Sequence, residues 1–245
     1  MSRVLTIDMG NGGLKAALFR DDKIEKRWRF KFDTGFEYVS EVLRNSSPEG
    51  VAVSSVVPEW TYSFLDKIDR EKYKGVLYVD SKTEFPFPVL LSSDAEVGAD
   101  RLCAACGSMQ IGVKEAVIVD FGTAVTVDVL SRKGYEGGVI FPGAEIILNS
   151  LHRETAVLPF IRSLSGPGKM PGKDTREAIS SGTFWGILGA VEKLIERSLE
   201  TLSSDARIIL TGGGISVISS HLKGSFLIEP DLVSKGLLML YNMNM

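Results

Sequence analysis

The stretch Val4-Leu5-Thr6-Ile7-Asp8-Met9-Gly10-Asn11-Gly12-Gly13 decides the fold of this chain. Its apolar first part is typical of a buried strand, which ends in Asp-x-Gly, turns sharply and returns as residues 14–20. Glycine lets a turn come close to a phosphate, whose oxygens the backbone N–H groups can then bind. Asp8, at the end of the strand, stands where a cation carried by such phosphates needs a carboxylate. The stretch therefore predicts a hairpin that binds phosphate.

A second copy of this pattern lies further along the chain. The strand-like run Ala116-Val117-Ile118-Val119 leads into Asp120-Phe121-Gly122-Thr123-Ala124, and the chain returns as residues 125–131. A single Asp-x-Gly hairpin is a weak signal. Two of them, at matching places in matching halves, predict a duplicated fold with a nucleotide between the halves.

The periodicity of the remaining sequence supports two similar halves. The first half, residues 1–97, is predicted to contain strands at 4–8, 14–20, 24–32, 51–57 and 76–79 and helices at 36–44 and 59–68. The second half, residues 98–245, is predicted to contain strands at 116–120, 125–131, 135–141, 207–211 and 226–229 and helices at 98–111, 143–153, 176–200, 214–221 and 231–241. Apart from inserted loops, both halves run strand, strand, strand, helix, strand, helix, strand. This order predicts an α/β fold with mixed sheets flanked by helices.

Three segments between these elements are rich in glycine or proline. Residues 84–91, with two prolines, are predicted to be extended or looped, and residues 163–174 to form a mobile loop. The third segment, Thr211-Gly212-Gly213-Gly214, follows a strand and opens a helix. Alone it suits a tight turn equally well, but after two Asp-x-Gly hairpins it suits the nucleoside end of a bound nucleotide.

The composition is that of a compact globular protein. Of the 245 residues, 44% are hydrophobic and 24% charged, and a net charge of −3 without a basic stripe argues against a nucleic-acid partner. No apolar run reaches the length of a membrane span, and the N-terminus leads directly into a strand, so a cytoplasmic location is expected. Cys103 and Cys106 share one face of a predicted helix. We interpret them as small buried residues, because His152 and His221 are too far away in sequence to complete a zinc site.

A series of further motifs now points to a family. Asp8-Met9-Gly10-Asn11 with Lys15 resembles D-x-G-N-[ST]-x-x-K, the opening motif of the type III pantothenate kinases. Gly98-Ala99-Asp100-Arg101 is similar to their G-x-D-R motif, and residues 120–128 to their D-x-G-T-x-x-T-x-D motif. Other family motifs resemble, in order, residues 54–58, 137–143, 155–159, 175–182 and 230–233. The resemblance covers nearly the whole chain.

This resemblance implies a fold, an activity and an assembly. The fold is a pair of ribonuclease H-like domains of the actin-like ATPase type, with the nucleotide cleft between them. The activity is phosphoryl transfer from ATP, with Mg²⁺, to the hydroxyl of pantothenate, which gives 4′-phosphopantothenate in the first step of coenzyme A biosynthesis. A monovalent cation, K⁺ or NH₄⁺, is implied as activator. A homodimer is implied as well, with candidate interface residues in 146–151 and 155–161, although a buried core helix is an equally serious interpretation of the first segment.

The resemblance also implies roles for individual residues. Asp100 matches the family's general base, which takes the proton from the pantothenate hydroxyl, and Asp120 matches the ligand of the monovalent cation. The residues matched to pantothenate binding are Gly98, Ala99, Asp100, Arg101 and Thr175, the last of which also suits a helix N-cap. The residues matched to ATP binding are Asp8, Met9, Gly10, Asn11, Gly12, Gly13, Lys15 and Thr123.

Two positions depart from the family pattern. Gly12 replaces the threonine or serine that follows Gly-Asn, so the turn keeps its backbone N–H groups but loses a hydroxyl. Leu91, in Leu91-Ser92-Ser93-Asp94, stands where the family has the substrate-binding tyrosine of Y-x-N-P. A phenol that bonds a buried substrate group is worth about 1–3 kcal/mol, so its loss bears on the affinity for the acceptor or on its identity.

Three functions therefore remain open at the level of the sequence. The first is a pantothenate kinase, and the second is a kinase of another small acidic alcohol, which Leu91 would suit. The third is a nucleotide-binding regulatory protein of the same fold, since members of this family were first described as accessory factors in gene regulation. Asp100 and Arg101 favour the two kinases, because a pure nucleotide binder needs no base at the acceptor.

Overall fold

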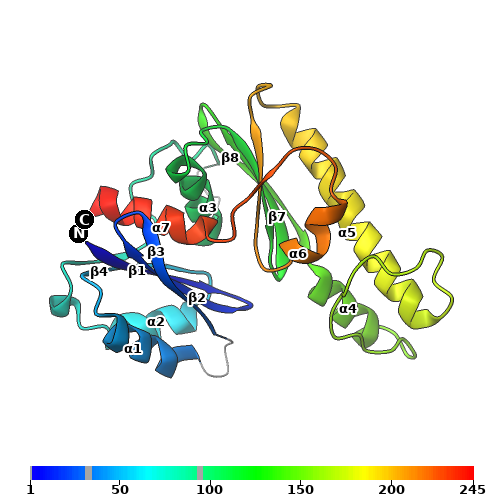
Figure 1. Cartoon of the computed structure of the whole chain (residues 1–245), viewed down its shortest axis with the longest axis horizontal. Coiled ribbons are helices and arrows are strands. Elements are labelled where there is room, and N and C mark those ends of the chain that lie inside the picture. Colours follow the sequence, from blue (N-terminus) through cyan, green and yellow to red (C-terminus); the bar gives the residue numbers. More distant parts are fainter. Residues whose placement is uncertain (1, 31–34, 93–95) are drawn as a thin grey trace. The chain divides into compact units, whose positions relative to one another are not determined.

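Two five-stranded sheets form the framework of the part of the protein that the structure describes (Figure 1). The computed structural model describes residues 2–30, 35–92 and 96–245. The strand order is β3-β2-β1-β4-β5 in the first sheet and, read from the matching edge, β8-β7-β6-β9-β10 in the second. Each sheet contains three strands that are consecutive in the chain and pair antiparallel. Two further strands lie beside the first of these three and run parallel to it. The sheets repeat one topology, which confirms the predicted duplicated α/β fold with mixed sheets.

The first sheet has helices on both faces. Its strands are β1 (Arg3–Gly10), β2 (Gly13–Arg20), β3 (Lys23–Phe30), β4 (Gly50–Ser55) and β5 (Gly75–Tyr78). One face packs on α1 (Gly35–Ser46) and α2 (Pro58–Lys67) through alternate residues of the strands, among them Leu5, Ile7 and Met9. The residues between them face α3 (Ala99–Gln110) and α7 (Leu232–Asn244). A short 3₁₀ helix, η1 (Arg70–Lys72), precedes β5.

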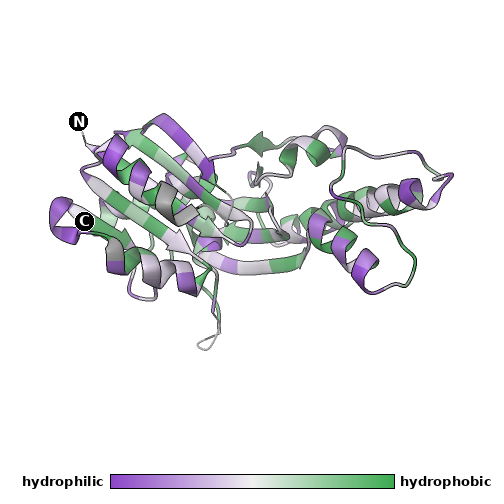
Figure 2. Cartoon of the chain, turned by 90° about the horizontal axis from the view of Figure 1, so that it is seen from below, coloured by the Kyte–Doolittle hydropathy of each residue, from purple (hydrophilic) through white to green (hydrophobic). Residues whose placement is uncertain are grey.

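The second sheet packs mainly on one long helix. Its strands are β6 (Ala116–Phe121), β7 (Ala124–Ser131), β8 (Gly134–Pro142), β9 (Arg207–Thr211) and β10 (Leu227–Ile228). The helices are α4 (Ala144–Arg153), α5 (Thr175–Leu199), α6 (Ile215–Ile218) and the 3₁₀ helix η2 (Ser219–His221). Phe184 and Val191 of α5 share a buried core with Val117 and Val127 of the sheet. Hydrophobic residues accordingly concentrate along the strands in Figure 2, whereas hydrophilic residues are frequent on the helices.

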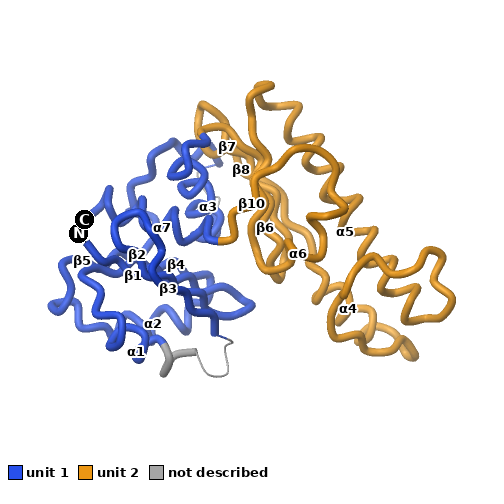
Figure 3. Tube along the Cα trace, in the orientation of Figure 1, with its two compact units in different colours: residues 1–113, 231–245 blue, residues 114–230 orange. Residues whose placement is uncertain are grey.

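The chain divides into two compact units, residues 1–113 with 231–245 and residues 114–230 (Figure 3). This division differs from the predicted boundary between residues 97 and 98, because α3 and α7 pack against each other within the first unit. Glycines make their contact close. A Cβ on Gly107 would lie 2.0 Å from the carbonyl oxygen of Leu232, and one on Gly236 would lie 1.8 Å from that of Cys103. The C-terminal helix thus returns to the first sheet.

The predicted strands and helices are present, with ends that differ by a few residues. The predicted strand at 24–32 is seen as far as Phe30, and its last two residues lie outside the described part of the chain. Residues 84–91 form neither a helix nor a strand, as their prolines predict, and residues 163–174 are irregular.

Candidate active site

Asp8 lies near the end of β1, between two polar neighbours on adjacent strands. The sheet register pairs it with Lys15 of β2 and with Ser54 of β4, so the three side chains lie on one face of the sheet. Ser54 Oγ donates a hydrogen bond of 2.9 Å to Asp8 Oδ1. The structure thereby joins the first hairpin to the segment 54–58. The sequence singled out that segment only as a motif and assigned Ser54 no role.

Burial and two neighbours together set the charge state of Asp8. The residue is 7% exposed. Loss of solvent raises its pKa above the usual value, while the positive charge of Lys15 and the hydrogen bond from Ser54 act in the opposite direction. These neighbours favour the ionised carboxylate, which is the form that can interact with a magnesium ion or with its bound water.

The turn after β1 presents open backbone. Asn11 and Gly12 form the turn and are exposed, while Gly10 and Gly13 face each other in the register. Gly13 has a φ of 131°, a conformation that residues with a side chain rarely adopt. Among the described residues, the atom nearest to a Cβ placed on Gly10 is the carbonyl oxygen of Gly13, at 4.0 Å. A phosphate can therefore approach this backbone closely.

The segment Gly98-Ala99-Asp100-Arg101 forms the start of α3, with Gly98 as the N-cap. Asp100 lies in the first turn, where its Oδ1 accepts a hydrogen bond of 2.9 Å from the backbone N–H of Arg101. The partial positive charge at a helix N-terminus stabilises a carboxylate at this place. A Cβ on Gly98 would lie 2.5 Å from Asp100 Oδ1 and 3.4 Å from Val56 Cγ1. Gly98 therefore leaves the space that the Asp100 carboxylate occupies.

Cys103 lies one turn after Asp100 and links it to Asp8. The thiol is fully buried, and burial raises its pKa well above the usual value. The negative charges of Asp8 and Asp100 raise this pKa further, and a hydrogen bond with Ser54 acts in the opposite direction. The contacts of Val56 show that the first unit brings the Asp8 hairpin and the Asp100 segment together: a Cβ on Gly98 would lie 3.4 Å from Val56 Cγ1, and the Val56 N–H donates to the carbonyl oxygen of Met9 at 3.0 Å. Both cysteines are buried, as the sequence predicts.

In the second unit, Asp120 occupies the position equivalent to that of Asp8. The register pairs it with Thr126 of β7 and with Thr211 of β9. The turn that follows contains Gly122 and Thr123, and Gly122 donates its backbone N–H to the carbonyl oxygen of Ala124 at 3.1 Å. Both Asp-x-Gly motifs thus end a central strand and are flanked by a hydroxyl residue on the parallel neighbour.

Glycines bring two further segments against the Asp120 hairpin. Gly212 has a φ of 97°, and a Cβ there would lie 2.3 Å from Asp120 Oδ1. A Cβ on Gly143, which precedes α4, would lie 2.4 Å from the carbonyl oxygen of Thr123. The glycine-rich turn 211–214 and the start of α4 are therefore neighbours of the second hairpin.

Thr175 is the first residue of α5 and is exposed. The interpretation of Thr175 as a helix N-cap is wrong, because Asp174 holds that position and its Oδ1 accepts a hydrogen bond of 2.9 Å from the Glu177 N–H. The preceding loop is attached to this helix. Ser181 Oγ donates a hydrogen bond of 2.7 Å to the carbonyl oxygen of Lys169. The hydroxyl of Thr175 is thus not used for capping.

The remaining predicted position, Leu91, is half-buried and lies between the elements of the first unit. Ser93 and Asp94, in the same stretch, lie outside the described residues.

Within residues 2–30, 35–92 and 96–245, no helix combines the length and the apolar character that crossing a membrane requires. The same residues contain no group of three or more His, Cys, Asp or Glu side chains that could hold a metal ion.

Solved structures share this fold. Two mixed sheets, each with an Asp-x-Gly hairpin, define the two-domain fold of actin-like ATPases and sugar kinases. A Campylobacter jejuni protein described as a Baf family transcriptional activator superposes with a TM-score of 0.61 at 16% identity, over 98% of both chains. A Sinorhizobium meliloti protein, provisionally described as a 2-dehydro-3-deoxygalactonokinase, superposes with a TM-score of 0.58 at 13% identity, again over 98% of both chains.

The sequence comparisons are more specific. The sequence model of the type III pantothenate kinase family matches residues 4–197. The type III pantothenate kinase of Syntrophotalea carbinolica is 33% identical over 98% of this chain and 99% of its own length. That of Dictyoglomus turgidum is also 33% identical, over 99% of this chain and 100% of its own length. The chain therefore belongs to the type III pantothenate kinase family.

Proposed function

We propose that this protein transfers the γ-phosphate of MgATP to the hydroxyl of pantothenate and so forms 4′-phosphopantothenate, the first step of coenzyme A biosynthesis. The observation that carries the proposal is the arrangement of Asp100 at the start of α3. Its carboxylate accepts a hydrogen bond from the Arg101 N–H, the missing side chain of Gly98 leaves room for it, and Val56 connects this segment with Met9 of the first hairpin. An acceptor base and a nucleotide-binding carboxylate thus belong to one unit. A cytoplasmic location, where ATP is available, is part of the proposal.

Asp100 is the proposed general base. A carboxylate is a weak base, but the transition state of phosphoryl transfer is loose, so that positioning matters more than basicity. The hydrogen bond from the Arg101 N–H to Asp100 Oδ1 holds the carboxylate in position at the start of α3.

The acceptor is proposed to bind beside this base. Arg101 suits the pantothenate carboxylate or a phosphate, since a guanidinium can form two parallel hydrogen bonds with either group. The backbone of Gly98 and Ala99 and the hydroxyl of Thr175 complete the proposed acceptor contacts. The exposure of Thr175 and the capping by Asp174 support this role, because no hydrogen bond joins the Thr175 hydroxyl to another described residue.

The phosphates of ATP are assigned to the Asp-x-Gly hairpins. The residues proposed for the first hairpin are Asp8, Met9, Gly10, Asn11, Gly12, Gly13 and Lys15, and Thr123 of the second hairpin is a further ATP contact. The open backbone at Gly10 and the positive φ of Gly13 support close approach of a phosphate. Asp8 would face the magnesium ion through water. The metal ion would neutralise charge on the phosphates during transfer.

Asp120 is the proposed ligand of the monovalent cation, K⁺ or NH₄⁺. The residue type fits, because a carboxylate is a suitable ligand for a hard cation. Gly212, by lacking a Cβ, lets the turn 211–214 lie directly against Asp120 Oδ1.

A homodimer is the proposed assembly, and exposed apolar side chains of the second unit support it. Val157 is 87% exposed, Phe160 50% and Ile146 37%, all within the predicted interface segments 146–151 and 155–161. Leu148, also in α4, is buried and belongs to the core instead. Light scattering at micromolar concentration should give twice the chain mass of 26.7 kDa. A fully active monomer would contradict the assembly.

A second candidate acceptor is favoured by one residue, Leu91, which stands in place of the expected tyrosine. A coupled assay of ADP release separates the two candidates when pantothenate is compared with a panel of small hydroxy acids, with saturating MgATP and ammonium present. Pantothenate is expected to give the highest kcat/KM. Absence of pantothenate phosphorylation, together with turnover of another hydroxy acid, would replace pantothenate by that acceptor.

A further inference from the structure

A row of four polar side chains crosses the first sheet on the face that carries Asp8. The register pairs Ser54 of β4 with Asp8 of β1, Asp8 with Lys15 of β2, and Lys15 with Arg29 of β3. Residues that are directly paired on adjacent strands point to the same face of a sheet. Arg29 therefore lies at the outer end of the row, one strand beyond the lysine that follows the first hairpin.

The packing of β3 determines which way Arg29 faces. Trp28 and Phe30, its neighbours in sequence, pack on the hydrophobic core under α1 and α2. Because consecutive residues of a strand point to opposite faces, Arg29 must point to the face of Asp8 and Lys15. The bulge in this strand pair lies between Leu18 and Phe19, outside the segment that places Lys15 and Arg29.

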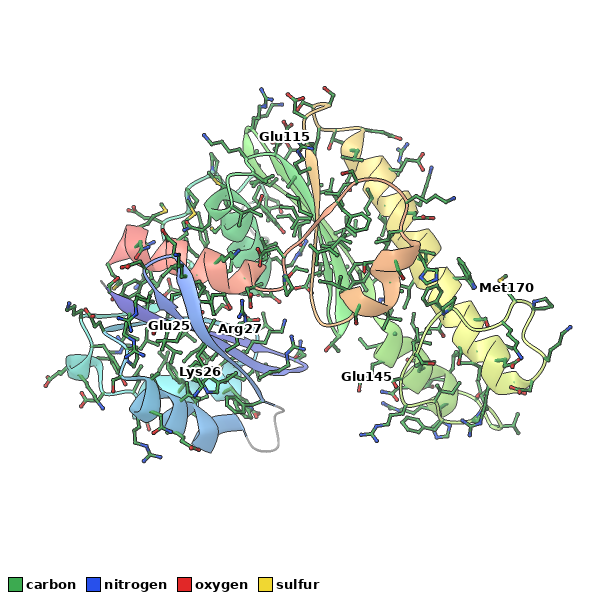
Figure 4. All side chains as sticks on the ribbon, in the orientation of Figure 1. Glu25, Lys26, Arg27, Glu115, Glu145 and Met170 are labelled. Carbon is green, nitrogen blue, oxygen red and sulfur yellow. The ribbon has the colours of Figure 1, made fainter. Side chains whose placement is uncertain are left out.

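Arg29 faces a cation across the strand pair, and the described residues supply it with no counter-ion. Like charges directly opposite each other destabilise a strand pair. Arg29 is exposed, and no ion pair or side-chain hydrogen bond joins it to another described residue. Arg27, two residues earlier on the same face (labelled in Figure 4), is different, since its guanidinium donates to both carboxylate oxygens of Asp231 at 2.7–3.0 Å. One arginine of this face is thus neutralised within the fold, and the other is not.

We infer that Arg29 is a second cationic ligand, beside Lys15, for the phosphate oxygens of the nucleotide. The inference deepens the proposed function, because it extends the ATP-binding role of the first hairpin to β3. A guanidinium can donate two parallel hydrogen bonds to phosphate oxygens. A chain of phosphates carries several negative charges, so its binding would also relieve the repulsion between Lys15 and Arg29. The single carboxylate of an acceptor carries less negative charge and would relieve the repulsion between Lys15 and Arg29 less completely.

The test compares two neutralised positions on the same strand. Arg29→Gln removes the cation from the row. Lys26→Gln makes the same change of charge on the opposite face, where Lys26 Nζ lies 5.0 Å from the centre of the Trp28 ring. We expect Arg29→Gln to raise the KM for MgATP roughly tenfold, in the range for a hydrogen bond to a charged group, and to reduce the rise in Tm that MgATP causes. Lys26→Gln should match the wild type in both measurements.

The same measurements can overturn the inference. Equal MgATP responses of Arg29→Gln and Lys26→Gln would do so, as would an effect confined to the KM for pantothenate. Arg29→Lys, which keeps the charge but loses the paired hydrogen bonds, is expected to fall between the wild type and Arg29→Gln, and it serves as the test variant if the glutamine variant does not fold. The Tm shift with MgATP needs no acceptor. A protein that binds MgATP through Arg29 but does not phosphorylate pantothenate would therefore contradict the proposed function and support this inference.

Discussion

Ser54 Oγ and Asp8 Oδ1 lie 2.9 Å apart in a hydrogen bond between residues 46 positions apart in the sequence. Ser54 is fully buried and Asp8 nearly so. Because both residues are buried, water cannot replace the Ser54 hydroxyl as the hydrogen-bond donor to the Asp8 carboxylate, and loss of this donor therefore destabilises the ionised form of Asp8. The bond also ties the motif at 54–58 to the first hairpin, and thus to the proposed nucleotide site.

Ser54→Ala is expected to shift the pH dependence of nucleotide use. The hydroxyl is one of two groups that oppose the rise of the Asp8 pKa caused by burial, so its loss should raise that pKa further. When the pH is lowered, Asp8 of the variant would then take up its proton at a higher pH than Asp8 of the wild type. The acid limb of the kcat/KM profile for MgATP should consequently move to higher pH.

Two matched variants control this prediction. Ser54→Thr keeps the hydroxyl and should keep the acid limb near its wild-type position. Ser55→Ala removes the adjacent hydroxyl, which donates to the carbonyl oxygen of Val57 instead, and should leave the profile unchanged. An identical profile for Ser54→Ala and the wild type would show that the bond does not govern Asp8.

Asp100→Asn should abolish most turnover while ATP still binds. A general base contributes a factor on the order of 10²–10⁴ to kcat, and an amide cannot take the proton of the acceptor hydroxyl. Steady-state kinetics should therefore show this loss in kcat with a nearly unchanged KM for MgATP. Glu96→Gln, which neutralises an exposed carboxylate just before the motif, is the control. Wild-type turnover of Asp100→Asn would remove Asp100 from the role of base.

Activity should rise steeply with K⁺ or NH₄⁺ and much less with Na⁺. A cation at Asp120 would neutralise charge between this carboxylate and the anionic nucleotide. Initial rates in buffers that differ only in the monovalent cation measure the effect, and Asp120→Asn should lose most of it. Equal rates in sodium-only and potassium buffers would contradict the assignment of Asp120.

Leu91→Tyr should improve pantothenate binding if pantothenate is the acceptor. The phenol would restore a hydrogen bond that acts equally on the ground state and the transition state, so KM should fall with little change in kcat. A bond of about 1.4 kcal/mol corresponds to roughly a tenfold lower KM. A KM that stays the same or rises would indicate a pocket shaped for another acceptor, in which the larger ring does not fit.

Tyr135→Phe should destabilise the second unit without affecting catalysis directly. Tyr135 Oη donates a hydrogen bond of 2.5 Å to Asp128 Oδ1, and both residues are buried. Thr126 Oγ1 donates to the other oxygen at 3.0 Å. Loss of the phenol leaves a buried carboxylate with one donor fewer, which should lower the free energy of unfolding by about 1–3 kcal/mol. Urea unfolding measures the change, and Tyr62→Phe, at a position 74% exposed, should cause almost none.

The sequence by itself determined the repeated fold and the positions of the two hairpins. Alternation of apolar residues along a strand and glycines at a sharp turn are local properties, readable without knowledge of distant contacts. For that reason the hairpins of Asp8 and Asp120, and the strands on either side of them, agree with the structure. The motif order likewise indicated the family that the comparisons show.

Only the tertiary structure decided which of these residues meet. The row from Ser54 to Arg29 depends on the register between strands, and a slip of one residue would turn each side chain to the other face. The return of α7 to the first unit depends on long-range packing through Gly107 and Gly236. A glycine in a sequence marks a close approach, but the fold alone shows what approaches it. At Gly98 the neighbour is the carboxylate of Asp100, which the missing side chain leaves room for.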